Sequence, residues 1–254
     1  MPYVNAILTL PTPLLLLTLC GFVALCLLLS LALLFALTRR GSQPATSIPV
    51  PPFVGVVAAA WALALGFAAA DIWTLGAQAD RAASAERSSI ARLAGASAPQ
   101  ALDLPDMNEA IRRYAEAVAR TEWGQDLNSA PHPDVDAALQ DIRIALIAAA
   151  SAGLPDAIAG KLVRDFDELQ DARNDRLAIG QSLVDEAKWY LVAVLTLMTM
   201  VAIVVVHLDR PRGAARALVI FAAVALSSLW VLALHVHPYA NRPFAVVLVA
   251  TSAT

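Results

Sequence analysis

Charged side chains are scarce in this sequence: they make up 15% of its 254 residues, whereas 59% of the residues are hydrophobic. Outside residues 78–188 the chain has only two acidic residues, Asp71 and Asp209. The mean hydropathy of +0.64 exceeds that of soluble domains and is typical of a protein with several membrane spans. We therefore expect the lipid bilayer to be a partner of this chain.

Cysteine and histidine are rare as well, which limits metal and redox chemistry. Cys20 and Cys26 lie in one apolar run, nearly two helical turns apart, so they cannot readily form a disulfide. An H-x-H pair, His235 and His237, could bind zinc on an extended segment. With four histidines in the chain and no cysteine or acid near this pair, a location at the membrane interface is the simpler interpretation. We expect no metal and no cofactor.

Motifs of the common enzyme classes are missing too. The sequence has no G-x-S-x-G, no P-loop, no H-E-x-x-H and no pair of acids spaced for catalysis. We therefore predict that the protein is not an enzyme.

Four long apolar runs predict four transmembrane helices, at about 14–37, 53–70, 189–208 and 214–234. A cleaved secretory signal is the alternative for the first run, but no Lys or Arg precedes it and its core is too long. The connections within the first and second pairs are short, which predicts two hairpins. The chain then divides into a hairpin at 1–77, a soluble insert at 78–188 and a hairpin with a short tail at 189–254.

The insert between the hairpins is acidic and helical in pattern. It holds 12 of the 18 Lys and Arg and 19 of the 21 Asp and Glu, a net charge of −7 that leaves +4 for the rest. Such an acidic segment argues against a nucleic-acid partner. Apolar residues recur at helical spacing after Pro105, Pro133 and Pro155, and Asp106 with Glu109 forms a capping-box pattern. We predict an all-α fold whose insert is a helical bundle.

Proline is absent between Pro52 and Pro99, and again between Pro155 and Pro211. We therefore expect two uninterrupted helices, roughly 60 and 80 Å long, that continue spans two and three into the insert. The rods carry apolar residues on several faces, among them Ile90, Leu93, Leu162 and Phe166. We expect a homo-oligomer to cover these faces, because such assemblies usually close by symmetry.

The positive-inside rule predicts the orientation. Arg39 and Arg40 follow the first apolar run. Arg210 and Arg212 lie between the third and fourth apolar runs, and Arg216 lies at the start of the fourth. Both hairpin connections then face the cytoplasm, so residues 78–188 are predicted to be extracytoplasmic.

Four stretches, taken in order, resemble the bacterial bestrophin-like family of unknown function. They are GFAAADIWTLGAQAD, IRRYAEAVARTEW, LQDARNDRLAIGQSLV and HPYANRPF. The matching residues are Tyr114, Val118, Glu122 and Trp123 of a Y-x-x-x-V-x-x-x-E-W signature, Arg173 and Arg176 of an arginine-bearing helix, and Arg242, Pro243 and Phe244 of a D-R-P-F element. Asn241 stands where that element usually has its acid.

The resemblance implies kinship with bestrophins, which are oligomeric anion channels with four spans and a helical domain between spans two and three. That layout agrees with the one predicted here and suggests a pentamer in the bacterial inner membrane. The predicted orientation differs, because a bestrophin holds the intervening domain in the cytoplasm. By this analogy inorganic ions are the expected cargo.

Span two is the best candidate to line a pore, because it is the least bulky span. Gly66 and Phe67 would form a constriction, and Asp71 would lie at the outer mouth beside Trp73. The simpler interpretation of Asp71 and Trp73 is an interfacial acid with an aromatic anchor.

Tyr114, Glu122 and Trp123 are better explained as a docking surface between helices than as a ligand site, with Arg173 or Arg176 as the partner of Glu122. For the whole protein, an ion channel competes with a non-conducting scaffold or sensor. In that alternative the outward domain binds a partner.

Overall fold

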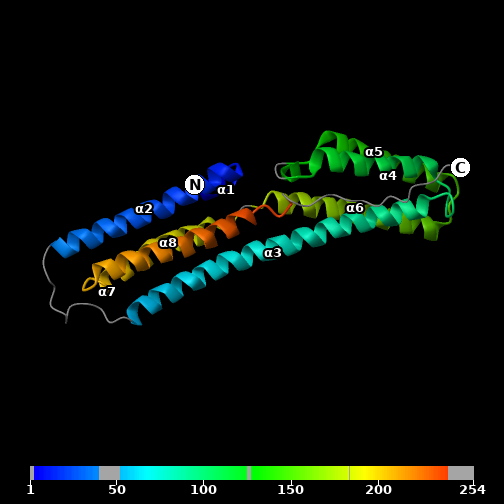
Figure 1. Ribbon diagram of the computed structural model, residues 1–254. Coiled ribbons are helices and arrows are strands. Elements are labelled where there is room, and N and C mark those ends of the chain that lie inside the picture. Colours follow the sequence, from blue (N-terminus) through cyan, green and yellow to red (C-terminus); the bar gives the residue numbers. More distant parts are fainter. Residues whose placement is uncertain (1–2, 40–51, 125–126, 183, 240–254) are drawn as a thin grey trace. The chain divides into compact units, whose positions relative to one another are not determined.

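The computed structural model describes residues 3–39, 52–124, 127–182 and 184–239, and over these ranges the chain is helical without any strand. The elements, in chain order, are α1 (Tyr3–Leu8), α2 (Thr12–Arg39), α3 (Pro52–Ser97), α4 (Pro105–Ala117), the π-helix η2 (Val118–Glu122), the short 3₁₀ helix η3 (Leu127–Ser129), α5 (Pro133–Ser151), α6 (Asp156–Gly180), α7 (Glu186–Val206) and α8 (Pro211–Leu234) (Figure 1). The all-α prediction is confirmed.

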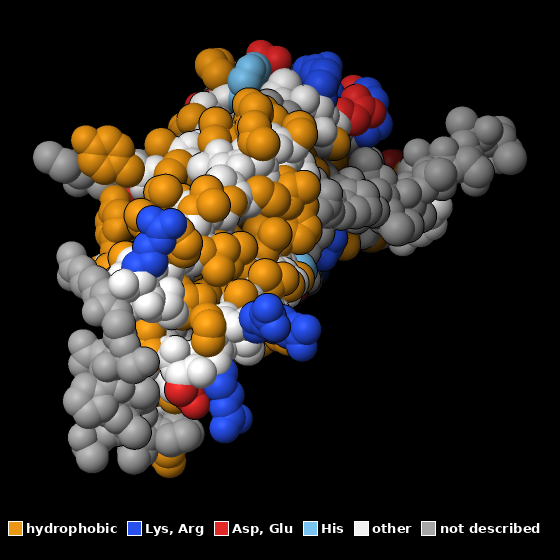
Figure 2. Space-filling view, turned by 60° about the vertical axis from the view of Figure 1, so that its left-hand side comes forward, with side chains coloured by type: hydrophobic (Ala, Val, Ile, Leu, Met, Phe, Trp, Pro, Cys, Tyr) orange, Lys and Arg blue, Asp and Glu red, His pale blue; other side chains and the backbone are white. Residues whose placement is uncertain are grey.

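Four helices, α2, α3, α7 and α8, are long and apolar enough to cross a membrane, which confirms the four predicted spans. The face seen in Figure 2 is mostly hydrophobic, with Lys and Arg side chains projecting between the apolar groups. Exposed leucines such as Leu17, Leu25 and Leu28 of α2 fit a surface that lies in lipid.

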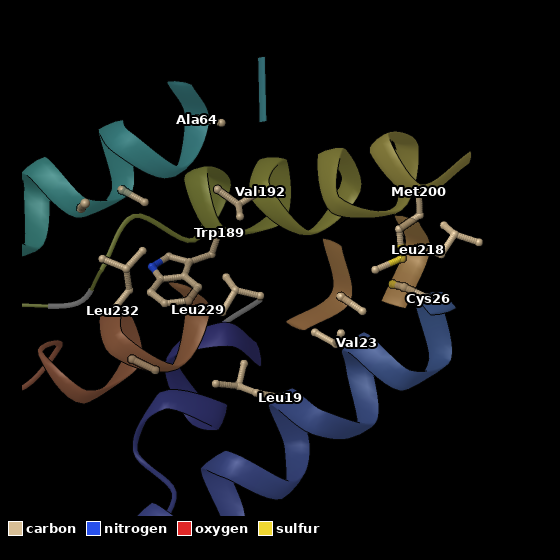
Figure 3. Packing of buried hydrophobic residues seen from close by; sticks show 14 of the residues in the cluster. Leu19, Val23, Cys26, Ala64, Trp189, Val192, Met200, Leu218, Leu229 and Leu232 are labelled. Atoms are coloured by element: carbon tan, nitrogen blue, oxygen red, sulfur yellow. The ribbon is translucent and has the colours of Figure 1, made fainter. Parts of the chain in front are cut away.

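Two compact units make up the chain: unit 1 comprises residues 1–74 and 183–236, and unit 2 comprises residues 75–182 and 237–254. In unit 1, the spans pack through a stripe on α2 that includes Leu19, Val23 and Cys26. Of these side chains, Cys26 lies beside Met200 of α7 and Leu218 of α8 (Figure 3). The spacing of three or four residues along α2 puts this stripe on one face.

Hydrogen bonds between elements add to the packing of unit 1. The indole Nε1 of Trp61 on α3 donates to Thr196 Oγ1 of α7 at 2.9 Å, and both residues are buried. The Trp61 ring also lies edge-on to Phe221 of α8, with ring centroids 5.1 Å apart. At the start of the chain, Asn5 donates through Nδ2 to Glu186 Oε1 at 2.9 Å, which ties α1 to the first turn of α7.

The expectation of two uninterrupted helices is half right. α3 runs through all 46 residues from Pro52 to Ser97 without a break. The second expected rod is wrong, because α6 ends at Gly180 and α7 begins at Glu186. Asp185 caps the new helix, accepting from the Ala187 backbone N–H at 3.0 Å. An N-cap carboxylate favours the start of a new helix and a glycine favours the end of the one before it, and the search for proline alone overlooked both signals.

The core of unit 2 corrects the first argument for an oligomer. Ile90 and Leu93 of α3 are fully buried, and Leu162 and Phe166 of α6 are nearly so, within this single chain. Residues of α4 and α5 complete this core: Met107, Ile111, Tyr114, Val135 and Ile142. These apolar faces therefore need no second subunit to cover them.

The predicted helix starts in unit 2 are correct at Pro105 and Pro133, and the third helix begins one residue after Pro155. The capping box is wrong: α4 has no side-chain cap, and Glu109 accepts instead from Arg112, one turn farther along. α5 is capped by His132, whose ring accepts from the Asp134 backbone N–H.

The Trp61–Thr196 bond gives a direct test of packing between the spans. Thr196→Val keeps the shape but leaves the buried indole N–H without its acceptor, which costs about 0.6–2 kcal/mol inside a membrane bundle. Thr199→Val is the matched control, because Thr199 is equally buried and its hydroxyl donates only to Leu195 O of its own helix. Unfolding of the purified protein in mixed micelles should show the larger loss for Thr196→Val, and equal losses would contradict this role.

Candidate functional site

The predicted pore residues lie on an uncovered face of α3. Gly66, Phe67, Asp71 and Trp73 are all exposed in the single chain, Phe67 at 57% and Trp73 at 67% of their surface. Only 22% of the most apolar stretch of α3 is buried, against 50% for α7. Of the four spans, α3 therefore has the most surface left for lipid or for another subunit.

Small residues follow one another along this face. Gly55, Ala59, Ala62, Gly66 and Ala70 are exposed and recur every three or four residues, which places them in one stripe on the helix. A Cβ added to Gly55 or Gly66 would meet no atom within 4 Å. Packing within the chain does not require these glycines, so their small size is free to serve a contact outside it.

Asp71 is not an isolated acid. Its carboxylate accepts a hydrogen bond from the Lys188 ammonium of α7, and that ammonium is also 3.8 Å from Asp185. Asp71 and Lys188 together carry no net charge. The electrostatic effect of Asp71 at this position is therefore partly cancelled by its partner.

In unit 2, three of the predicted residues, Glu122, Arg173 and Arg176, meet Glu86 in a buried charge network. Glu86 of α3, Glu122 of η2, and Arg173 and Arg176 of α6 are each at most 5% exposed. Arg176 is bound by both acids: Nε lies 2.5 Å from Glu86 Oε2, and Nη2 lies 2.8 Å from Glu122 Oε2. Arg173 donates to the same Glu122 carboxylate through Nε and Nη2.

One further carboxylate and several neutral groups complete this buried charge network: Asp136 Oδ1 of α5 lies 2.7 Å from Arg173 Nη1. Tyr114 Oη donates to Glu86 Oε1 at 2.7 Å, and Arg176 Nη1 donates to Asn128 Oδ1 at 2.6 Å. The His132 backbone N–H donates to Glu122 Oε1 at 2.8 Å. A buried ion pair offsets its desolvation only when such extra bonds are made, and here they are.

The predicted pairing of Glu122 with Arg173 or Arg176 is present, and it involves both arginines. Glu122 is the last residue of the π-helix, and the chain turns to an extended conformation at Trp123. The arrangement links α3, η2 and α6. This is the geometry of a structural cross-link, because the acids and the guanidinium groups already saturate one another.

Burial and hydrogen bonding shift the pKa values of the network in opposite directions. Burial alone raises the pKa of Glu122, but the bonds from Arg173, the His132 N–H and Arg176 outweigh it, so the pKa lies below its usual 4.5. The pKa of Tyr114 is raised well above 10, first by burial and then by the Glu86 charge. Tyr114 thus stays protonated and keeps donating to Glu86.

Trp123 contacts a residue that lies beyond α8 in the sequence. Its ring centroid is 5.4 Å from that of Tyr239, which is 3% exposed and also packs beside Ala79 and Ala83 of α3. Burial raises the pKa of Tyr239 to about 12. The signature Trp123 therefore anchors the segment that follows α8 to the core of unit 2.

Sequence reasoning missed Glu86, Asn128 and Gly180. Glu86 lies among small residues of α3 with no apolar or motif signal, although an acid on the buried side of the helix follows from the spacing of Ile90 and Leu93. A Cβ on Gly180 would lie 2.1 Å from Asn128 O, so only glycine admits η3 here. Arg242, Pro243 and Phe244 lie outside the described residues.

Comparison with known proteins gives one match. The family model described as a bestrophin-like domain matches residues 20–247. No curated protein and no solved structure matches the chain. The match, together with the four apolar helices, identifies an integral membrane protein.

Removing one partner from the network should be costly. Arg176→Met leaves Glu86 buried without a cation, and we expect a loss of about 3–5 kcal/mol in the free energy of unfolding. Glu86→Gln with Arg176→Met should cost less than the sum of the single changes, because neither charge is then stranded. Arg112→Met, at an exposed ion-paired arginine of α4, is the control, with about 0–1 kcal/mol. Additive losses in denaturant unfolding would contradict the network.

Acid should weaken unit 2 through Glu122. Its folded pKa is below the unfolded value of 4.5, so its contribution is complete above 4.5 and is lost as the pH falls through the folded pKa. In Glu122→Gln the loss of stability below pH 4.5 should be shallower than in the parent. Glu116→Gln, which removes an exposed carboxylate paired with Arg112, is the control. Hydrogen exchange of peptides from α4 and α6 between pH 7 and pH 3 measures the effect, and parallel profiles would refute it.

Proposed function

The chain belongs to the bestrophin-like family, and from this premise we propose that it is an oligomeric ion channel whose axial pore is lined by the span of α3. The observation that supports this proposal is the exposed stripe of glycine and alanine residues on α3. A membrane protein must cover such a face with lipid, with another subunit or with water. Glycine and alanine stripes favour close approach of a second helix.

The composition of the four spans supports an assembly of several copies. Four helices of mostly Leu, Ala and Val enclose no polar interior of their own, so a single chain offers ions no route. Copies arranged around an axis, each turning its α3 face inward, create one. Five copies are suggested by the bestrophin analogy alone, at the level of architecture.

Gly66 and Phe67 form the constriction of the proposed pore, and Trp73 lies near its outer mouth. Phe67 is exposed on α3, one turn from the exposed Leu63 and from the small residue Ala70. A ring of phenylalanines makes an apolar neck, which excludes ions by dewetting when it narrows. Gating by such a neck needs no buried charge in the spans.

Ion preference depends on charge at the mouth. The Asp71–Lys188 pair is neutral, whereas segment 78–188 carries −7 per chain. Acidic surfaces gather cations and repel anions near a pore entrance. We therefore propose that the bestrophin preference for anions does not carry over to this protein.

Location and orientation belong to the same proposal. The two transmembrane hairpins lie in the bacterial inner membrane, and the helical bundle of residues 78–188 is extracytoplasmic. The arginines of the hairpin connections support this orientation, because they outnumber acids there and are missing from the N-terminal segment.

A non-conducting scaffold or sensor is the second candidate. Its support is the cross-linked core of unit 2, which holds a partner-binding domain rigid without any need for a water path. In that case lipid covers the exposed face of α3, and Gly66 and Phe67 serve only helix packing.

Planar-bilayer recording decides between the two candidates. If α3 lines the pore, Phe67→Ala widens the neck and raises the single-channel conductance. Asp71→Asn leaves Lys188 unpaired and adds one positive charge per subunit at the mouth, so permeability shifts towards anions. Lys188→Gln is the matched variant and should shift it towards cations.

Arg113→Gln, an exposed arginine of α4 in unit 2, serves as the control with little change. The absence of current from a verified oligomer, or shifts of the same sign in Asp71→Asn and Lys188→Gln, would overturn the channel proposal.

A further inference from the structure

A group of arginines gathers at one end of the span bundle in unit 1. Arg39 is the last residue of α2, and Arg210, Arg212 and Arg216 lie in the α7–α8 turn and the first turns of α8. α2 packs against both α7 and α8, with Cys26 close to Met200 and Leu218 (Figure 3). Beyond Cys26, α2 continues to Arg39, and beyond Met200, α7 continues to the turn that leads into α8. The four arginines therefore lie at the same end of the span bundle. We call them the basic collar.

The charge of the basic collar is mostly uncompensated. Arg210 is 3.3 Å from Asp209 and 81% exposed at its side chain, and Arg39 stacks on Phe35 at 3.9 Å. Within the described ranges, no carboxylate pairs with Arg39, Arg212 or Arg216. Four guanidinium groups thus face one acid. In the rest of unit 1, by contrast, Lys188 is paired.

The basic collar lies directly beside the apolar surface of the spans. Phe35 on α2 and Val219 and Ile220 on α8 are more than half exposed, within about one turn of the nearest arginine. A side chain that leaves an apolar surface at the end of a span reaches the level of lipid headgroups. A guanidinium group there binds a phosphate oxygen through parallel N–H bonds.

We propose that the basic collar is a binding surface for anionic phospholipid headgroups of the adjoining leaflet. The charge of the headgroup identifies the occupant. In a zwitterionic headgroup the ammonium group cancels the negative charge of the phosphate, whereas an anionic headgroup keeps a net negative charge that can pair with the arginines. Each arginine near a membrane surface contributes about 1 kcal/mol of attraction to anionic lipid. The proposal rests on the membrane location and does not depend on conduction.

Lipid titration of the purified full-length protein tests this surface. Delipidated protein in a neutral detergent is titrated with phosphatidylglycerol and with phosphatidylcholine of the same acyl chains, and bound lipid is counted by native mass spectrometry. Phosphatidylglycerol should bind tighter. Arg212→Gln with Arg216→Gln should weaken it roughly 30-fold, the equivalent of about 1 kcal/mol for each arginine.

Arg112→Gln with Arg113→Gln, two exposed arginines of α4, is the control that keeps full affinity. Inorganic phosphate at constant ionic strength should not displace the lipid. Equal binding of the two lipids, unchanged affinity in the collar variant, or displacement by free phosphate would each overturn the proposal. The four arginines would then serve only to orient the spans during insertion. Unchanged thermal unfolding of the variant shows that a loss of binding is not a loss of fold.

Discussion

The contact of Arg176 with Glu86 and Glu122 is the interaction on which unit 2 depends. It joins α3 to α6 and to the π-helix, and it fixes one side of α3 as the buried side. Ile90 and Leu93 extend that side with apolar contacts. Because both acids are buried and need a cation beside them, the network favours the register of these helices that keeps Arg176 between Glu86 and Glu122. Residues on the remaining sides of α3 are then available for other contacts.

In unit 1 the same helix is held by fewer contacts. Trp61 forms a hydrogen bond with Thr196 and packs against Phe221, while the stripe that includes Gly66 and Ala70 faces outward. A span that makes few contacts within its own bundle can face a pore shared among subunits without loss of packing in the single chain. The paired Asp71 and Lys188 make the charge of the proposed mouth adjustable in both directions by single substitutions. The basic collar lies in the same unit and concerns lipid, so its role is separate from conduction.

Much of the fold was predictable because membrane spans have a strong signal. Long apolar runs gave all four spans, and Pro105 and Pro133 marked helix starts. The break at residues 181–185 was missed because it depends on the Asp185 cap and on the close approach of Asn128 to Gly180, and neither leaves a mark as plain as proline. The pairing of Glu122 with arginine was predictable from the rule that buried charges are paired. The roles of Glu86 and Asn128 were not, since neither residue belongs to a motif that the sequence offers, and only the fold brings them to Arg176, 90 and 48 positions away.

In the proposed channel, the outward stripe of α3 faces water inside an oligomer. Substituted-cysteine accessibility tests it most directly, with single cysteines at positions 55 to 70 and a charged, membrane-impermeant thiol reagent applied to reconstituted protein. Cysteines at the positions of Gly55, Ala59, Ala62, Gly66 and Ala70 should react, whereas cysteines at the positions of the buried Ala64 and Ala68 should not. Reaction at none of the five positions, in protein that carries an accessible control cysteine in unit 2, would show that lipid covers the stripe and would contradict the channel.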